Sequence, residues 1–264
     1  MPISLDLSGR HAIVCGSTSG IGRAIAHRFA EAGADVSLLA RSEDRLRIVL
    51  DELAELRPNG QFTFRAADFT TPEAVRKAVH DLIVQRDAHI LVNNTGGPPP
   101  GELNAASTEA LAKAFRMHVL ANQHLVQAVA SSMRAQGGGR IINVISTSVK
   151  EPLPGLGVSN TIRGAVANWA KTLANELGPH GITVNNILPG FTQTERLNSL
   201  IMDRAQQANK AHKAVAQQMA ETVPLGRFAR AEEIANAALF LASDLAAYIS
   251  GINLPVDGGR TRSL

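Results

Sequence analysis

The chain has 264 residues, of which 45% are hydrophobic and 19% charged, the proportions of a soluble globular protein. The formal net charge of +3 comes from scattered basic residues without a basic run, so nucleic acid is not an expected partner. No apolar run is long enough to span a bilayer and no signal peptide is visible, so we expect a cytoplasmic protein without membrane contacts. The single cysteine, Cys15, excludes an internal disulfide, and the eight histidines lack metal-ligand spacing, so no metal is expected.

Short apolar segments rich in β-branched residues recur along the chain and predict about seven β-strands. They are His11–Cys15, Asp35–Ala40, Phe62–Ala66, Ile90–Val92, Arg140–Ile145, Thr183–Leu188 and Ile252–Val256. Longer segments with apolar residues at helical spacing separate most of them. Strands that alternate with helices indicate a parallel sheet covered on both faces. No linker or change of composition divides the chain, so we predict one α/β domain over residues 1–264.

Residues 191–222 differ from the other connections because they are rich in Ala, Gln and Lys and too long for a simple crossover. Apolar residues at helical spacing run through most of this segment, at Leu197, Leu200, Ile201, Ala208, Val215 and Met219. Long insertions in compact domains usually serve a function, so we predict a helical substrate lid. The alternative is an amphipathic helical insertion without a functional role.

A glycine-rich turn follows the first predicted strand, with the spacing G-x-x-x-G-x-G. Glycines permit a tight turn, and backbone N–H groups at the start of the next helix can bind a pyrophosphate. The turn therefore predicts a dinucleotide site made by Gly16, Ser17, Thr18, Ser19, Gly20, Ile21 and Gly22.

The end of the second predicted strand indicates which dinucleotide is bound. An acidic residue there would bind the ribose hydroxyls of NAD. The chain has Ala40 and Arg41 instead, and a guanidinium suits the additional 2′-phosphate of NADP. We therefore predict NADP(H), with NADPH favoured over NADH, the alternative being that Arg41 is a solvated loop charge.

Several motifs in one order resemble the short-chain dehydrogenase/reductase family over nearly the whole chain. They are the glycine turn, Asp68-Phe69, Asn93-Asn94-Thr95-Gly96, Leu188-Pro189-Gly190, and the ending Gly251-Ile252-Asn253 with Val256-Asp257-Gly258-Gly259. The resemblance implies a single Rossmann-like, doubly wound domain, a nicotinamide cofactor and a small-molecule substrate. It also implies a homotetramer or homodimer, built on the helices expected over residues 105–135 and 161–177.

By the same resemblance, further residues are expected to contact the cofactor. Asp68 and Phe69 would flank the adenine, and Asn94 and Gly96 would lie near the riboses. The turn at Pro189-Gly190 would direct the nicotinamide, with Thr192 and Thr194 holding the carboxamide and phosphates.

The family's catalytic pattern is only partly present. Members normally carry an Asn, a Ser, and a Tyr followed four positions later by Lys. Ser146 stands at the serine position, whereas Ser159, Arg163 and His118 stand at the Tyr, Lys and Asn positions. A serine hydroxyl is a far weaker acid than a phenol, and Arg163 does not deprotonate, so it can bind a ribose hydroxyl but not relay protons. Carbonyl reduction with a tyrosine proton donor is therefore not expected.

Two other residues are candidate proton donors. His118 shares a helix face with Leu111, Phe115, Asn122 and Leu125, so we expect it to point inward. The alternative is a hydrogen-bonded core histidine. Lys150 lies four residues after Ser146 and would act as an acid or bind a substrate carboxylate, the alternative being a solvated surface lysine.

Two short runs, Lys150-Glu151-Pro152 and Pro189–Arg196, are similar to those of a Tyr-lacking member of the family, the reductase of bacilysin biosynthesis. That class reduces a conjugated double bond. The leading hypothesis is therefore an NADPH-dependent oxidoreductase that reduces a ketone or activated alkene of a small anionic or acyl substrate. Two alternatives stay open, namely a catalytically silent NADP(H)-binding sensor or assembly protein, and a 3-oxoacyl-thioester reductase.

Overall fold

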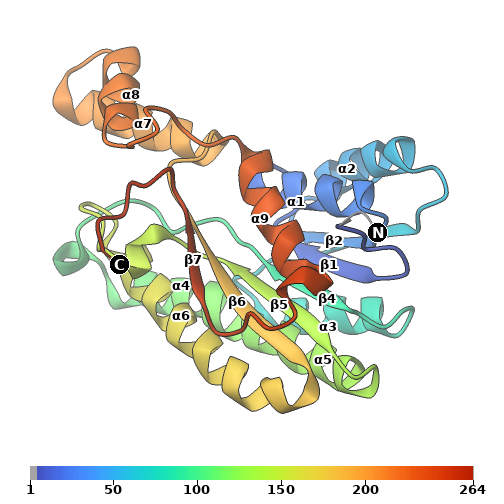
Figure 1. Ribbon diagram of the computed structural model, residues 1–264. Coiled ribbons are helices and arrows are strands. Elements are labelled where there is room, and N and C mark those ends of the chain that lie inside the picture. The colour runs from blue at the N-terminus through green and yellow to red at the C-terminus, as the bar shows by residue number, and fades with distance from the viewer. Residues whose placement is uncertain (1–4, 264) are drawn as a thin grey trace.

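Seven parallel strands form one sheet in the computed structural model, which describes residues 5–263 (Figure 1). The strand order is β3-β2-β1-β4-β5-β6-β7, so the chain winds outward in both directions from the β1–β4 pair. This order confirms the predicted Rossmann-like, doubly wound α/β fold. The strands are β1 His11–Cys15, β2 Asp35–Ala40, β3 Phe62–Ala66, β4 Ile90–Asn93, β5 Gly139–Val144, β6 Ile182–Pro189 and β7 Asn253–Val256.

The ends of four strands differ from the predicted ones by one residue. β4 extends to Asn93 because that residue pairs with Asn143 in β5, and β5 begins at Gly139 because Gly139 pairs with Ile182. β5 also ends one residue early, β6 is longer at both ends, and β7 begins one residue late. Pairing with neighbouring strands sets these ends, whereas apolar character alone had set the predicted ones.

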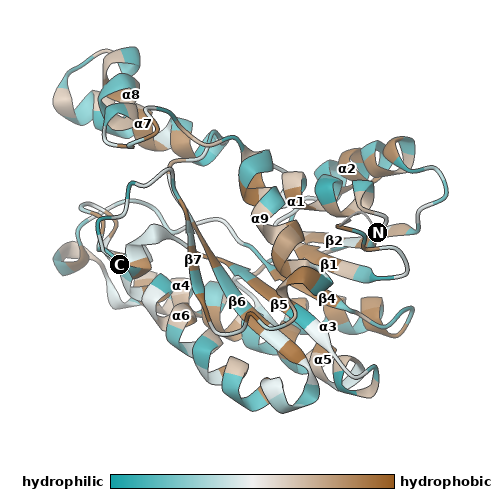
Figure 2. Ribbon diagram, viewed as in Figure 1, coloured by the Kyte–Doolittle hydropathy of each residue, from teal (hydrophilic) through white to brown (hydrophobic). Residues whose placement is uncertain are grey.

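Helices cover both faces of the sheet (Figure 1). One layer contains α1 Gly20–Glu31, α2 Glu43–Leu56 and α9 Ala231–Ala242, and the other contains α3 Pro72–Ile83, α4 Thr108–Phe115, α5 Ala121–Ala135 and α6 Gly157–Leu177. Alternate residues of β1 enter the two cores, as expected for a strand buried on both sides. Figure 2 shows apolar residues gathered on the strands and on the inward helix faces. Within residues 5–263, no helix has the length and apolarity needed to cross a membrane.

Residues 191–222 form two helices that project beyond the sheet, α7 Glu195–Ala208 and α8 His212–Glu221 (Figure 1). The Thr194 hydroxyl accepts a hydrogen bond from the Leu197 backbone N–H at 3.3 Å and begins α7. Asn209, with φ of 49°, ends it in the left-handed conformation. The two helices bury a small apolar cluster of their own around Ile201 and Met219, so they form a unit beside the main core.

A π-helical turn at Arg116–Leu120 lies between α4 and α5, where one continuous helix was expected. The extra residue of a π turn rotates the faces of the helix relative to one another. His118 is inward at 1% exposure, as predicted, but Phe115 is 41% exposed, so the prediction that both share one inward face is wrong.

Four asparagines from four adjacent strands form a row of side-chain hydrogen bonds across the sheet. Asn93 Nδ2 donates to Asn143 Oδ1 at 2.8 Å, and Asn143 Nδ2 donates to Asn186 Oδ1 at 2.9 Å. Asn186 Nδ2 in turn donates to Asn253 Oδ1 at 2.8 Å. The first three residues are buried, so each amide depends on its neighbours for its hydrogen bonds.

Replacing Asn186 with Ala is expected to lower the free energy of unfolding by about 2–4 kcal/mol, because it leaves a buried Asn143 donor and the Asn253 acceptor without partners. Urea denaturation followed by circular dichroism measures the change. Asn198→Ala, on the exposed side of α7, is the matched control and is expected to stay within about 0.5 kcal/mol of the parent. Equal stability of the two variants would show that the row contributes nothing.

Candidate active site

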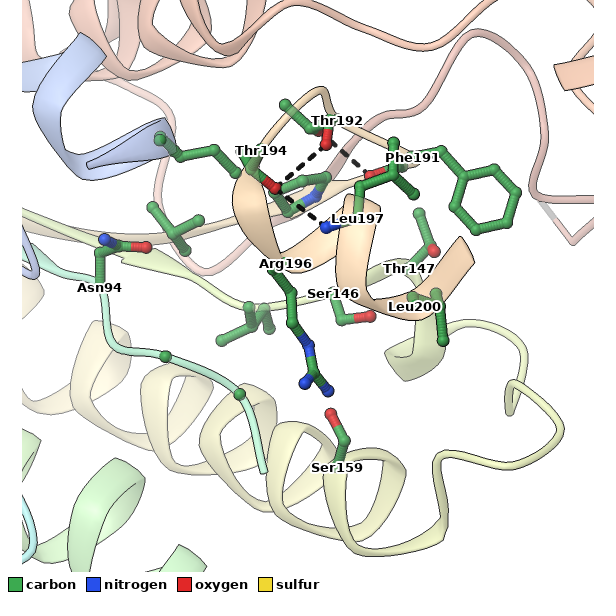
Figure 3. A pocket seen from close by; sticks show the side chains of 18 of the residues that line it. Asn94, Ser146, Thr147, Ser159, Phe191, Thr192, Thr194, Arg196, Leu197 and Leu200 are labelled. Atoms are coloured by element: carbon green, nitrogen blue, oxygen red, sulfur yellow. Dashed lines mark hydrogen bonds between the residues drawn. The ribbon is translucent and has the colours of Figure 1, made fainter. Parts of the chain in front are cut away.

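A cavity of about 410 Å³ opens at the carboxyl ends of the central strands, where ligands bind in open α/β sheets. Its walls come from the glycine turn after β1, the segment after β4, the end of β5, the start of α6 and the first turn of α7. Figure 3 shows side chains from these segments converging on one space. The topology thus brings residues distant in the sequence to one site.

The glycine turn packs against Asn94 so closely that no side chain fits between them. A Cβ on Gly16 would lie 2.4 Å from the Asn94 carbonyl oxygen, and a Cβ on Gly22 would lie 2.2 Å from the Gly16 carbonyl oxygen. Asn94 Nδ2 donates to the carbonyl oxygens of Cys15 and Gly16, both at 3.3 Å. Gly16 also has φ of 58°, a conformation that favours glycine.

The start of α1 leaves hydrogen-bond donors for a ligand. Ser19 is the N-cap residue, but its side chain makes no capping hydrogen bond to the helix. Ser17 is buried, and its hydroxyl has no hydrogen-bond partner among residues 5–263. Within the described residues, the N-terminus of α1 therefore offers backbone N–H groups without a side-chain cap and an unpaired serine hydroxyl, and both can donate hydrogen bonds to the phosphate groups of a dinucleotide.

A second hollow of about 1020 Å³ continues from the first. The two share Gly16, Ser19, Thr95, Gly96, Gly97 and Glu195. The far part of the second hollow is lined by Ala40, Arg41, Ser42, Arg45, Asp68 and Phe69, together with Lys113. The structure therefore brings the predicted adenosine residues Arg41, Asp68 and Phe69 to one wall. Arg45 and Lys113 were not predicted, because helix-surface charges have no distinguishing sequence pattern.

Asp68 is held in its charged form in this second hollow. A hydrogen bond from the Thr70 backbone N–H, at 2.8 Å, is the main cause that lowers the pKa of the Asp68 carboxyl. The positive charges of Arg41 and Lys113 lower it further. This part of the hollow thus combines the Asp68 carboxylate with the cations Arg41, Arg45 and Lys113.

Three of the five predicted catalytic residues, Ser146, Ser159 and Arg163, line the first cavity. β5 ends at Val144, and the Ser146 hydroxyl accepts a hydrogen bond from the Ser148 backbone N–H at 3.1 Å. This contact begins a 3₁₀ turn and leaves Ser146 half-buried at the cavity. Ser159 lies in the first turn of α6, which begins at Gly157, and its hydroxyl points toward the cavity (Figure 3).

Arg163 is a buried cation whose hydrogen-bond acceptors within residues 5–263 are backbone carbonyl oxygens. It is 8% exposed, and its guanidinium donates to the Val144 carbonyl oxygen at 3.1 Å and to the Thr95 carbonyl oxygen at 3.5 Å. No carboxylate within residues 5–263 forms an ion pair with it. Burial, and secondarily the charge of Arg196, lower the pKa of Arg163 to about 10. The group therefore stays protonated at neutral pH and favours a bound anion or hydroxyl oxygen.

His118 and Lys150, the two predicted proton donors, lie outside the lining of the first cavity. His118 Nδ1 is hydrogen-bonded to the Thr95 hydroxyl at 2.7 Å, so His118 lies behind a lining residue. Burial, and then the charge of Arg163, lower the pKa of His118 to about 2, so it is neutral at physiological pH. Lys150 follows the 3₁₀ turn Thr147–Val149, which separates it from Ser146 at the cavity.

The cavity also contains charged residues that the sequence did not single out. Arg196, from the first turn of α7, donates to the Pro98 carbonyl oxygen at 2.6 Å and points toward Ser159 (Figure 3). Arg260, near the C-terminus, lies over the Phe191 ring at 4.3 Å. The predicted residues Pro189, Gly190, Thr192 and Thr194 line the same side. The sequence did contain a signal for Arg196. It follows the predicted cofactor residue Thr194 by two positions, in the first turn of α7, so a position near the cavity could have been expected.

Acid is expected to destabilise the protein partly through His118. Its pKa in the fold is about 2, whereas an unfolded histidine protonates near about 6.5, so only the unfolded chain gains this proton as the pH falls below that value. Each such group lowers stability by at most about 1.4 kcal/mol per pH unit. Urea denaturation at about pH 7.5 and about pH 5.5 is expected to show a smaller pH dependence for His118→Asn than for the parent.

His180→Gln replaces an exposed histidine and is the matched control, so its stability is expected to depend on pH as that of the parent does. An unchanged pH dependence in His118→Asn would contradict the neutral state assigned to the buried histidine.

Comparisons of the sequence and the fold with known proteins identify the family of this chain. A family model described as enoyl-(acyl carrier protein) reductase matches residues 16–261. The NADPH-dependent reductase BacG of Bacillus subtilis is 28% identical over 98% of this chain and 100% of its own. A 3alpha-hydroxysteroid dehydrogenase of Mediterraneibacter gnavus is 35% identical over 96% of this chain and 97% of its own. The crystal structure of L-sorbose reductase from Gluconobacter frateurii, complexed with NADPH and L-sorbose, is 34% identical with a TM-score of 0.93, over 99% of this chain and 100% of that one.

The chain belongs to this enoyl reductase family of short-chain dehydrogenases/reductases. Because its relatives are dehydrogenases and reductases, the protein is an oxidoreductase.

Proposed function

We propose that this protein reduces a ketone or an activated alkene of a small anionic or acyl substrate with NADPH. The observation that carries the proposal is the continuity of the two hollows, which join the glycine turn and the Arg41 wall to Ser146, Ser159 and Arg163. The uncapped start of α1 and the orphaned Ser17 hydroxyl fit the pyrophosphate of a dinucleotide. Bound NADPH supplies a hydride at the site.

Preference for NADPH over NADH rests on the wall at the end of β2. Ala40 leaves no carboxylate to accept hydrogen bonds from a ribose, and Arg41 and Arg45 supply two guanidiniums. Guanidinium groups bind phosphate through charge-assisted, bidentate hydrogen bonds. The BacG and L-sorbose reductase relatives are described with NADPH, which is consistent with this assignment.

The proposed chemistry follows from the absence of a phenol at position 159. Hydride addition to a carbonyl forms an alkoxide, and addition to a conjugated alkene forms an enolate. Hydroxyl donors of Ser146 and Ser159 and the fixed charge of Arg163 would stabilise either oxyanion. An enolate is the less basic anion and can take its proton from water, so an activated alkene suits this site better than a simple ketone.

We also propose that α7 and α8 act as a substrate lid. Their apolar cluster is separate from the main core, and the first turn of α7 carries Glu195, Arg196 and Leu197 to the cavity. Movement of such a unit would change access to the site without disturbing the sheet.

Self-association is part of the proposal as well. Phe115 and Leu120 are 41% and 39% exposed in the segment over residues 105–135 that the family resemblance assigns to the subunit interface. A homotetramer or homodimer would cover them.

Fluorescence titration with NADPH and NADH, followed by assays of NADPH oxidation against ketones and enones, tests the function. Acetylacrylate is a suitable first compound because it carries a ketone, a conjugated alkene and a carboxylate, and product analysis shows which bond was reduced. Tight binding of NADPH without oxidation by any compound would support the silent binding protein instead. Reduction of 3-oxoacyl thioesters alone would support the acyl reductase.

Arg41→Ala is expected to weaken NADPH binding by about 10- to 100-fold, because it removes charge-assisted hydrogen bonds to the 2′-phosphate. NADH affinity should change little, and both dissociation constants come from fluorescence titration. Arg47→Ala on α2, where Arg47 pairs with Glu43 on the surface, is the matched control. Equal losses for NADPH and NADH would refute the role given to Arg41.

Ser146→Ala is expected to lower kcat by about 10- to 1000-fold through loss of an oxyanion donor, with NADPH affinity nearly intact. Steady-state kinetics and cofactor titration separate the two effects. Lys150→Ala is the informative companion, since Lys150 lies outside the cavity lining and its removal should change kcat far less. The assignment would fail if Ser146→Ala kept the parent's kcat.

A further inference from the structure

Two guanidiniums face the same point of the cavity. A methyl group placed on Gly97 would lie 3.8 Å from Arg163 Nη2 and 3.8 Å from both Nε and Nη2 of Arg196. Both arginines line the cavity, and neither forms an ion pair with a carboxylate of residues 5–263. Like charges held together without an ion-paired carboxylate favour binding of an anion.

The two arginines differ in what they can offer to a ligand. Arg163 is buried and donates to the Val144 and Thr95 carbonyl oxygens, so its position is fixed by β5 and the segment after β4. Arg196 is exposed and has one neutral acceptor, the Pro98 carbonyl oxygen, at 2.6 Å. A carboxylate is a stronger acceptor for a guanidinium than a backbone carbonyl and can bind both of its arms. Arg196 is therefore the arginine that can exchange its present partner for a ligand.

The position of Arg196 places this ligand at the reacting end of the cavity. Figure 3 shows its side chain descending from α7 to a point between Ser146 and Ser159. Arg196 lines the first cavity and not the second, which holds the Arg41 wall, so its ligand lies on the side of the active-site serines. Leu153, Leu156 and Leu200 line the remaining surface and suit a short apolar body. A cavity of about 410 Å³ limits that body to a small molecule.

We propose that Arg196 binds a carboxylate of the substrate and restricts the enzyme to small carboxylic acids whose reducible carbonyl or alkene lies within a few bonds of that carboxylate. This inference rests on the proposed function and adds the residue that selects the substrate class. The carboxylate replaces the Pro98 oxygen as the acceptor of Arg196, and the charge of Arg163, close to the same point at Gly97, adds attraction. Because Arg196 belongs to the first turn of α7, an acid substrate also ties that helix to the site.

A carboxylic acid and its neutral methyl ester test the proposal. The parent protein is expected to use acetylacrylate with a kcat/KM about 10- to 100-fold above that of its methyl ester, since the ester loses a charge-assisted contact. Arg196→Met should abolish this preference, and Arg196→Lys, which keeps the charge without the planar fork, should retain part of it. Arg204→Met removes the same charge two turns along α7 and is expected to keep the parent's preference.

Two further measurements make the result decisive. Affinity for NADPH should change less than about twofold in Arg196→Met, because Arg196 points toward Ser159 and does not line the hollow that holds the Arg41 wall. A loss of NADPH affinity would assign Arg196 to the cofactor phosphates and overturn the proposal. Calorimetric titration of the NADPH complex with valerate, which has no reducible bond, should show binding by the parent that weakens at least about tenfold in Arg196→Met.

These outcomes separate the inference from the proposed function. If no ketone or enone is reduced by the parent, the proposed function fails, and valerate binding still decides the role of Arg196. If acetylacrylate is reduced with the same preference over its ester in Arg196→Met, only the carboxylate role fails. Equal valerate affinity in the parent and Arg196→Met would also contradict the role of Arg196 in binding the carboxylate, independently of any turnover.

Discussion

The contact between the β1 turn and the end of β4 sets the geometry on which the whole site depends. The two strands are neighbours in the sheet, and their connections lead to opposite faces, so the segments after them separate and leave a crevice. At its base, Gly16 and Gly22 let the turn pack directly on Asn94, whose amide donates to two backbone carbonyls of β1 and the turn. The start of α1 is thereby held at the crevice with its N–H groups available for phosphates.

Polar groups continue from this contact into the middle of the sheet. The row of asparagines begins one residue before Asn94, at Asn93, and crosses β5 and β6 to β7. A buried amide that loses one partner is costly, so the row favours a single register of these strands. Register matters here because Ser146 follows β5 and the Pro189-Gly190 turn ends β6, and a shift of either strand would displace a wall of the cavity.

Electrostatics then distinguish this site from one built on a tyrosine and a lysine. Ser159 stands where the family resemblance expects a phenol, and the nearby cation is Arg163, which stays charged at neutral pH and donates to the Val144 carbonyl oxygen. In the proposed function, the site stabilises oxyanions rather than delivering protons, which favours substrates whose reduced form is a stabilised anion. Arg196 adds a second, exposed cation from the α7 segment, so attraction for anions is built into both walls.

Much of the fold could be predicted from the sequence because its signals are local. Alternating β-branched and helical segments indicated the strands and helices, and glycine spacing indicated the turn, since both depend on short-range sterics and hydrogen bonding. Errors occurred where distant partners decide: strand ends follow the pairing of residues such as Asn93 with Asn143, and the π turn at His118 has no sequence signature.

The sequence by itself determined the doubly wound sheet and the glycine turn, and it showed Ser159 and Arg163 at the positions where the family resemblance expects Tyr and Lys. Only the tertiary structure decided the state of these groups. His118 is neutral because burial and the charge of Arg163 act on it together, and Lys150 does not line the cavity although it follows Ser146 by only four residues. Arg196 reaches the site through a contact with Pro98, 98 residues earlier in the chain. The charge environment of a site is a sum over groups brought together by folding, so no local pattern contains it.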